Sequence, residues 1–399
     1  MIIREKYLKY IRPFYDEDLI KVITGIRRCG KSVLLNQIVD ELLINKIKDT
    51  QIIYINFEFL DYNFIQDSND LNKYIKDKII NKNKYYLLFD EIQNVTNWEK
   101  AINSFKASLN VSIFITGSNS NLLSGELASH LAGRYVSFNL LPFTFKEICE
   151  YYKLKKEDNL DEIFLDYIKW GGLPQRLNFK DEFQVKTYLS DVYDSIVVKD
   201  IIKSFGIKDV DLFNRIVEYI VTTPSQTFSA QNLSDYFKNI GDRNISKETI
   251  YNYLEYMSNA FLINKVDRYD LRGKRILDGK YKYYLTDLGL GQIKNIGKKP
   301  QLGAYLENIV YNELISRDYD VKIGSIGKGE IDFIATKFDE KIYIQVAYIL
   351  ADESVIEREL GAFKNIKDNY PKYLITTDKI NMSQNGIIHY NIIDWLLED

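Results

Sequence analysis

The segment from Gly25 to Ser32, GIRRCGKS, constrains the fold of this chain more than any other. It lies between a short apolar run, LIKVIT, and a segment whose apolar residues recur at helical spacing. This order of strand, glycine-containing loop and helix is the setting in which the pattern G-x-x-x-x-G-K-[ST] forms a phosphate-binding loop. The segment therefore predicts an α/β nucleotide-binding domain, which we place at residues 1–150.

The residue types in this loop match the chemistry of a nucleotide phosphate. Gly25 and Gly30 let the backbone turn and bring its N–H groups onto the phosphates. The helix that begins near Lys31 directs the positive end of its dipole at the same anion. We expect Lys31 to reach the β- and γ-phosphates and the Ser32 hydroxyl to ligate Mg²⁺. Arg27 inside the loop is a further candidate for a phosphate or partner contact.

A second apolar run, YYLLFDEI, ends in two carboxylates about 60 residues after the loop. A buried parallel strand has this composition, and its carboxyl end faces the ligand crevice. We expect Asp90 to hold the Mg²⁺ and Glu91 to activate or orient the attacking water. The residues predicted to bind ATP and its metal are Gly25, Arg28, Gly30, Lys31, Ser32, Val33 and Asp90.

Two further signals follow this acidic pair. The strand-like run VSIFITGSNS ends in polar residues, so Ser118 or Asn119 is a candidate for the side chain that positions water. The alternative, that they cap a helix, is equally open. Arg134 can stabilise transition-state charge in cis or from a neighbouring subunit, or it can form a surface salt bridge. The predicted catalytic residues are Glu91, Lys31, Arg134 and Asn119.

Composition excludes several other classes of protein. Two cysteines far apart and two histidines give neither a disulfide framework nor a structural zinc site. The net charge of -3 argues against a uniformly basic nucleic-acid binder. Because the sequence has no long uncharged apolar run and no signal peptide, we expect a cytoplasmic protein that does not enter a membrane.

Residues 151–295 change character. A helical connector at 151–205 is broken at WGGLP, where we expect a hinge. Residues 206–295 contain three helical patterns, then a strand, a basic loop and another strand, which is the order of a winged helix-turn-helix. Double-stranded DNA is one candidate partner of this domain, and the acidic Glu248 and Glu255 on its third helix weaken that case. Packing or protein contact is the alternative use. The candidate DNA contacts are Arg272, Lys274, Arg275 and Lys280.

Residues 296–399 read as a restriction-endonuclease-like α/β domain with a damaged site. A helix carries Glu307, one strand carries Asp332, and the next strand carries Gln345 and Ala347. Nucleases of this fold place an acid and a lysine where this chain has Gln345 and Ala347, and there the acids hold a metal ion. The sequence therefore predicts an incomplete second site, unless a lysine from elsewhere, such as Lys328, substitutes.

The runs GIRRCGKS, LLFDEIQ and FITGSNSNLLSGELASHLAGRYVSFNLLPFTFKEI together resemble the large family of predicted prokaryotic AAA+ ATPases with an uncharacterised C-terminal domain. This family is similar to the branch that includes archaeal origin-recognition proteins and signalling ATPases. The resemblance implies an α/β chain: a P-loop AAA+ parallel-sheet domain, a helical and winged-helix region, and a C-terminal nuclease-like α/β domain. It also implies Mg-ATP hydrolysis, and rings or transient dimers in which Arg134 acts in trans.

Two functions remain open from the sequence. In the first, ATP hydrolysis drives a conformational change that acts on DNA. In the second, a signalling-type ATPase uses its nucleotide state to control contact with a protein partner, without nucleic acid. An ATP-dependent nuclease ranks last, because Ala347 offers no electrostatic help.

Overall fold

The computed structural model describes residues 2–118, 133–155, 158–239, 245–295, 300–327 and 329–398, except for the side chains of 278–280. The chain folds as two compact units. The first consists of Met1–Leu141 with Asn259–Phe261, and the second of Pro142–Ser258 with Leu262–Asp399. Within the described residues, no helix is both long enough and apolar enough to cross a bilayer.

The first unit is built on a five-stranded sheet in which every neighbouring pair is parallel. Its strand order is β2-β3-β4-β1-β5. The carboxyl ends of all five strands therefore lie at the same end of the sheet, which is where α/β proteins bind ligands. The strands are β1 (Ile20–Thr24), β2 (Ile52–Asn56), β3 (Tyr85–Asp90), β4 (Val111–Gly117) and β5 (Tyr135–Asn139).

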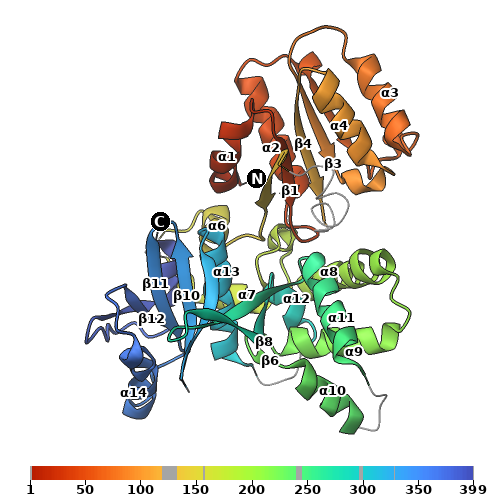
Figure 1. Ribbon diagram of the computed structural model, residues 1–399. Helices are drawn as coiled ribbons and strands as arrows, with labels where there is room; N and C mark the ends of the chain where they lie inside the picture. Colours follow the sequence, from red (N-terminus) through yellow and green to blue (C-terminus); the bar gives the residue numbers. More distant parts are fainter. Residues whose placement is uncertain are drawn as a thin grey trace. The chain divides into compact units, whose positions relative to one another are not determined.

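Helices cover both faces of this sheet. Figure 1 shows α1 and α2 on one face, and α3 and α4 on the other. Alternate strand residues, such as Leu87 and Phe89, pack against apolar residues of α3 and α4, including Leu71 and Phe105. The intervening residues face α2, and these include Asp90. The helices are α1 (Glu5–Ile11), α2 (Lys31–Ile44), α3 (Ser68–Lys78) and α4 (Trp98–Ser108).

The second unit begins with helices whose starts are fixed by short polar side chains. Thr144 and Glu147 form a reciprocal capping box at the start of α6. Asp181 and Asp209 cap α8 and α9 through backbone N–H groups. The helices are α6 (Phe145–Tyr152), α7 (Leu160–Trp170), α8 (Glu182–Ser195), α9 (Val210–Thr222), α10 (Ala230–Asn239) and α11 (Lys247–Asn259), with a π-helical segment at Ile196–Lys203.

The rest of the second unit is organised by one eight-stranded mixed sheet. Its order, β13-β12-β11-β10-β9-β7-β8-β6, joins the hairpin that follows α11 to the C-terminal strands through the parallel pair β7–β9. The strands are β6 (Thr227–Phe228), β7 (Ile263–Asp270), β8 (Arg275–Leu285), β9 (Asp320–Ile326), β10 (Gly329–Lys337), β11 (Glu340–Val346), β12 (Lys372–Thr376) and β13 (Ile387–Asn391).

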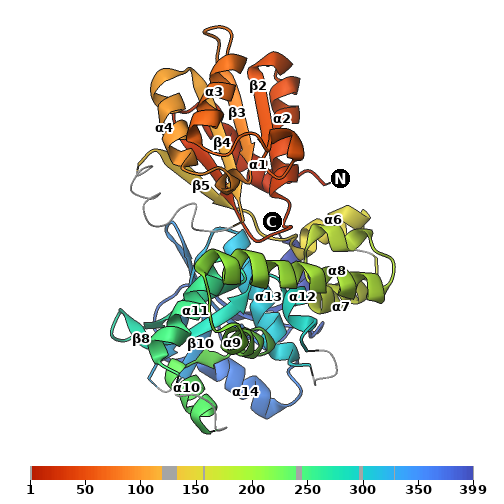
Figure 2. The same cartoon turned by 90° about the vertical axis from the view of Figure 1, so that its right-hand side faces the viewer.

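Four more helices pack with this sheet. The longest, α13, contacts β8, β9, β10 and β11. Figure 1 shows α8, α9, α10 and α11 grouped within the second unit, with β10 and α14 at another part of it, and in Figure 2 these four helices face the viewer. The helices are α12 (Leu288–Gln292), α13 (Leu302–Ser316), α14 (Glu353–Gly361) and α15 (Ile392–Leu397).

Two local predictions need correction. The segment expected as a basic loop is mostly strand, because β8 already begins at Arg275 and pairs with β7. The WGGLP turn, where the sequence predicted a hinge in a connector at 151–205, lies beyond the boundary between the units, which falls after Leu141. The turn lies inside the second unit, where the N–H of Gly172 donates to Oδ2 of the buried Asp287 at 2.7 Å.

Candidate nucleotide-binding site

The loop between β1 and α2 has a backbone that needs glycine at two positions. Gly25 has φ +149° and Gly30 has φ +109°, both in the region that side chains disfavour. A Cβ at Gly25 would also lie 2.2 Å from the carbonyl oxygen of Leu140. The loop therefore passes so close to Leu140, the residue after β5, that only glycine fits at position 25.

The start of α2 offers uncapped N–H groups to a ligand. No side chain caps this helix, in contrast to α8 and α9. The first N–H groups of a helix have no partner within it, and the helix dipole adds positive potential there. Lys31 and the half-buried Ser32 and Val33 form the first turn. This arrangement fits a phosphate.

The buried Asp90 at the end of β3 is held in place by three donors. Nδ2 of Asn56 donates to its Oδ2 at 3.0 Å, and the Tyr54 hydroxyl donates to the same oxygen at 3.1 Å. The Thr116 hydroxyl donates to Oδ1. Burial, and then the nearby Asp90, raise the pKa of Tyr54, so its hydroxyl keeps the proton that it donates. These donors fix the carboxylate at the carboxyl edge of the sheet.

Glu91 lies next to the loop in an unusual backbone conformation. Its φ is +53°, in the left-handed region, where a residue other than glycine is strained. Its N–H donates to the Thr116 hydroxyl at 3.0 Å, and its carboxylate accepts from the Gln93 amide. Its Oε1 lies 3.7 Å from Nζ of Lys31, which also donates to the carbonyl oxygen of Gly25 at 3.1 Å. The turn therefore places the Glu91 carboxylate beside the P-loop lysine.

The other predicted residues of this unit have different locations. Ser118 is buried one residue beyond β4, and Asn119 lies outside the described residues. Arg28 is exposed, whereas Arg27 lies 3.8 Å from Glu58. None of these positions contradicts a nucleotide contact.

Arg134 lies at the amino end of the strands, whereas the P-loop lies at their carboxyl end. It immediately precedes β5, and its carbonyl accepts the N–H of Ile20, the first residue of β1. The P-loop follows the last residue of β1, so the length of a five-residue strand, about 15 Å, separates the two. Arg134 is exposed there and donates to Asn103 at 3.4 Å. This distance removes the cis role that the sequence left open.

Four polar side chains surround the acidic pair, and the sequence pointed to only one of them, Thr116, as part of the polar end of VSIFITGSNS that was expected beside the γ-phosphate. Asn56 is paired in register with Asp90 across two parallel strands, and Tyr54 lies two residues earlier on the same face. Thr116 lies near the end of the neighbouring strand β4 and connects Asp90 with Glu91. Gln93 binds the Glu91 side chain. A polar residue at the carboxyl end of each strand beside β3 was the signal that could have identified them.

The predicted DNA-contacting residues lie in and beside the β7–β8 hairpin. Arg272, Lys274 and Arg275 are all exposed at its turn. The side chain of Lys280 is outside the described set. The exposed basic turn is compatible with phosphate contact. On α11, the acidic Glu248, which weakens the case for DNA, is exposed next to Lys247.

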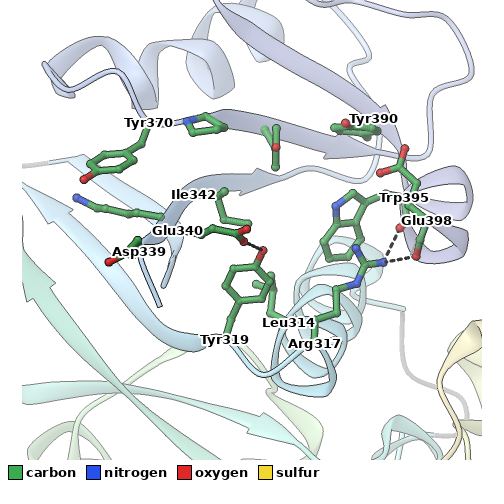
Figure 3. A pocket seen from close by; sticks show the side chains of 13 residues that line it. Leu314, Arg317, Tyr319, Asp339, Glu340, Ile342, Tyr370, Tyr390, Trp395 and Glu398 are labelled. Carbon is green, nitrogen blue, oxygen red and sulfur yellow. Dashed lines mark hydrogen bonds between the residues drawn. The ribbon is translucent and has the colours of Figure 1, made fainter. Parts of the chain in front are cut away.

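A hollow of about 420 Å³ in the second unit is lined by aromatic rings (Figure 3). Its cations already have partners. The Arg317 guanidinium donates to the carbonyl of Trp395 at 2.7 Å, and Lys341 pairs with Asp368 at 3.4 Å. No residue predicted to bind nucleotide lines it.

Sequence comparisons match these two units to different domains. A family described as an AAA domain matches residues 17–149, and one described as Domain of unknown function (DUF8612) matches residues 161–299. An uncharacterized protein of Haemophilus influenzae is 40% identical over 404 residues, covering 100% of this chain and 99% of that protein. An uncharacterized protein of Methanocaldococcus jannaschii is 33% identical over 386 residues, covering 93% and 82%. The chain belongs to the same family as these two proteins.

Structural comparison agrees with the fold of this AAA-domain family. A Walker-type ATPase of Pyrococcus abyssi matches with a TM-score of 0.51 at 16% identity, covering 74% of this chain and 96% of that one. The first unit therefore has an AAA-type P-loop ATPase fold, as the sequence predicted. Helical and mixed-sheet α/β regions follow it.

Proposed function

We propose that this AAA-domain protein binds Mg-ATP and hydrolyses it. The observation that supports this proposal most is the 3.7 Å approach of Glu91 Oε1 to Lys31 Nζ, next to the uncapped start of α2. The carboxylate that would activate water and the lysine that would bind phosphate thus lie together, although they are about 60 residues apart in the sequence.

The chemistry of the site assigns a role to each group. The N–H groups at the start of α2 bind phosphate oxygens, and Lys31 neutralises charge on the β- and γ-phosphates. The Ser32 hydroxyl and Asp90 would hold Mg²⁺, which neutralises phosphate charge when it is bound. Glu91 accepts a proton from water, or orients the water, in front of the γ-phosphate.

We propose that Arg134, if it contributes to hydrolysis, does so in trans. Its position at the amino end of β5 is too far from the P-loop of the same chain. In a ring or dimer, the exposed guanidinium can instead meet the nucleotide of a neighbouring copy. Mixing Arg134→Ala with Lys31→Ala chains tests this, because a trans arginine restores activity at mixed interfaces.

Steady-state ATP turnover tests the proposal. We expect Lys31→Ala to lose binding and turnover by at least about 100-fold, because a phosphate-binding charge is removed. Glu91→Gln should keep ATP binding and lose turnover by about 10²–10⁴-fold, the usual contribution of a general base. Lys100→Ala removes an exposed lysine of the same unit and should leave turnover unchanged. Wild-type protein that binds ATP but never turns it over would reject hydrolysis.

DNA is a second candidate partner, and we propose that residues 206–295 form a winged helix-turn-helix that contacts it. The exposed Arg272, Lys274 and Arg275 at the β7–β8 turn support this proposal. Hydrolysis in the first unit would then act on bound DNA. If no nucleic acid is involved, the same ATP site would control contact with a protein partner.

Salt dependence distinguishes these two functions. If the hairpin contacts phosphates, DNA should stimulate ATP turnover. The slope of log affinity for DNA against log salt concentration should also become less steep by about 3 when the three basic residues are replaced by alanine. A matched control removes three exposed lysines elsewhere in the second unit: Lys199, Lys203 and Lys208. No binding at low salt, or an equal effect of the control, favours the protein-partner function.

A further inference from the structure

A buried cluster in the second unit brings together charged side chains from three elements. Lys282 of β8 has a side chain that is only 6% exposed, and its Nζ lies 2.8 Å from Oε1 of Glu307 on α13. The same Nζ lies 2.8 Å from Oε1 of Glu330 and 3.9 Å from Oδ1 of Asp332, both on β10. One ammonium is thus shared by three carboxylates, and we call these four residues the Lys282 cluster.

The remaining polar contacts of the Lys282 cluster are also satisfied. The Tyr284 hydroxyl donates to Glu307 at 2.7 Å, and Arg268 lies 3.0 Å from Glu330. The second oxygen of Asp332 accepts the N–H of Val346 at 2.8 Å. The cluster therefore contacts groups from β7, β8, β10, β11 and α13, and the Glu330 side chain remains 29% exposed.

The charge of Lys282 is stable in this environment. Burial lowers its pKa, but attraction by Glu307, Asp332 and Glu330 outweighs burial and raises the pKa above its ordinary value. Burial raises the pKa of Asp332 well above its ordinary value, and repulsion by Glu307 adds to this. The contacts of 2.8 Å with Glu307 and Glu330 therefore place a cation that belongs to the chain among these side chains.

With Lys282 in place, these residues do not fit a divalent cation. Lys282 Nζ lies 2.8 Å from both Glu307 and Glu330, which is typical of ammonium–carboxylate hydrogen bonds, so the ammonium occupies the space between these carboxylates. The third predicted ligand, Gln345, uses its carbonyl oxygen to accept the N–H of Asp332 and donates its amide to Glu359. Within the described residues, no group of three or more acidic, histidine or cysteine side chains is arranged to hold a metal.

We propose that Lys282 takes the place of a metal ion among Glu307, Glu330 and Asp332, so that this cluster holds no divalent cation and supports no metal-dependent cleavage. Its ammonium instead ties strand β8 to α13 and β10. Lys282 lies on a strand that is distant in sequence from Gln345 and Ala347. The nuclease-like pattern would have its lysine at the position of Ala347. This proposal concerns the second unit alone and does not depend on ATP hydrolysis.

Manganese titration of nucleotide-free full-length protein, followed by electron paramagnetic resonance of free Mn²⁺, tests the proposal. Wild type and the variant Glu307→Gln/Asp332→Asn should bind the same amount of Mn²⁺. Lys282→Ala leaves three carboxylates without their cation, so it should bind about one Mn²⁺ with a Kd at or below about 1 mM. This binding should vanish when Glu307→Gln and Asp332→Asn are added.

Thermal unfolding gives a second readout. Lys282→Ala should lower the Tm by on the order of 10 °C, because it leaves buried carboxylates uncompensated, and Mn²⁺ should recover part of the loss. Lys265→Ala removes an exposed lysine from the same hairpin and should change neither Tm nor Mn²⁺ binding. The Tm of wild type should be the same in Mn²⁺ and in EDTA.

Three results would overturn the proposal. The first is wild-type Mn²⁺ binding that is lost in Glu307→Gln/Asp332→Asn. The second is wild-type DNA cleavage in Mg²⁺ that is lost in the same variant, which would make Lys282 a catalytic lysine. The third is a folded Lys282→Ala that binds no Mn²⁺. If Lys282→Ala does not fold in any condition, the wild-type titration and cleavage assay decide alone.

Discussion

Replacing Lys21 by methionine should remove a pH dependence from the stability of the first unit. Lys21 lies in β1 and is fully buried. Its Nζ donates to the Ser112 hydroxyl at 2.7 Å and to the carbonyl of Glu17 at 3.5 Å, and it lies 4.7 Å from the centre of the Phe114 ring. These partners carry no full charge, so they compensate an ammonium poorly.

The magnitude follows from the shift in pKa. Burial, and then repulsion by Lys84, lower the pKa of Lys21 from 10.5 to about 7. Between these values the unfolded chain binds a proton that the folded chain does not, so stability rises with pH through this window. From pH 7 to pH 9 this one group should add about 2 kcal/mol to the free energy of unfolding. Lys21→Met should lack this rise and be more stable at pH 7.

Urea unfolding at pH 7 and pH 9 measures this difference. Trp98 is the sole tryptophan of the first unit, and Trp170 and Trp395 belong to the second. In a background with both of these changed to phenylalanine, Trp98 fluorescence reports on the first unit. The change in the free energy of unfolding between the two pH values is compared for this background with and without Lys21→Met, so that the contributions of other titrating groups cancel.

A matched control is Lys100→Met, which removes an exposed lysine of the same unit and should keep the wild-type pH dependence. If Lys21→Met gains as much stability between pH 7 and pH 9 as the parent, to within about 0.5 kcal/mol, the reasoning fails. Lys21 would then be solvated or paired in solution, and its burial would not control its protonation.

Two more predictions concern the P-loop and the acidic pair. Thr116→Val should lower ATP turnover by about 10–100-fold, because Asp90 loses a donor that fixes its position, whereas Thr116→Ser should stay near wild type. Gly25→Ala should cost at least about 2 kcal/mol in thermal unfolding, since its Cβ would meet the Leu140 carbonyl and its φ is unfavourable. Gly361→Ala, with open space around its Cβ, should be near neutral, and equal effects of the two alanines would contradict the steric argument.

The sequence was sufficient for features encoded by adjacent residues. The P-loop needs only a strand, a glycine turn and a helix in succession, so GIRRCGKS between β1 and α2 was recognisable without tertiary information. The strand ending at Asp90 was equally visible, because an unbroken apolar run marks a buried parallel strand. The start of α11 is also fixed by neighbouring residues, because the Ser246 hydroxyl accepts the N–H of Thr249.

The end of the sheet at which a residue lies could be known only from the tertiary structure. Arg134 follows the acidic pair in sequence, which suggested a place near the nucleotide. It precedes β5, however, and a parallel strand puts its first residue at the edge opposite the P-loop. Strand direction, which depends on pairing with β1, therefore decided that Arg134 cannot serve its own site.

The second unit shows the same limit most clearly. A search for a lysine near Gln345 in sequence finds Ala347 and concludes that the site is incomplete. Only the fold shows that Lys282 of β8 lies against the carboxylates of Glu307 and Glu330, because α13 and β10 bring them to that strand. The sequence by itself predicted the P-loop ATPase fold, since the strand, glycine turn and helix that mark it are adjacent in the chain. Only the tertiary structure decided which charges meet, because electrostatic pairing depends on distance in space.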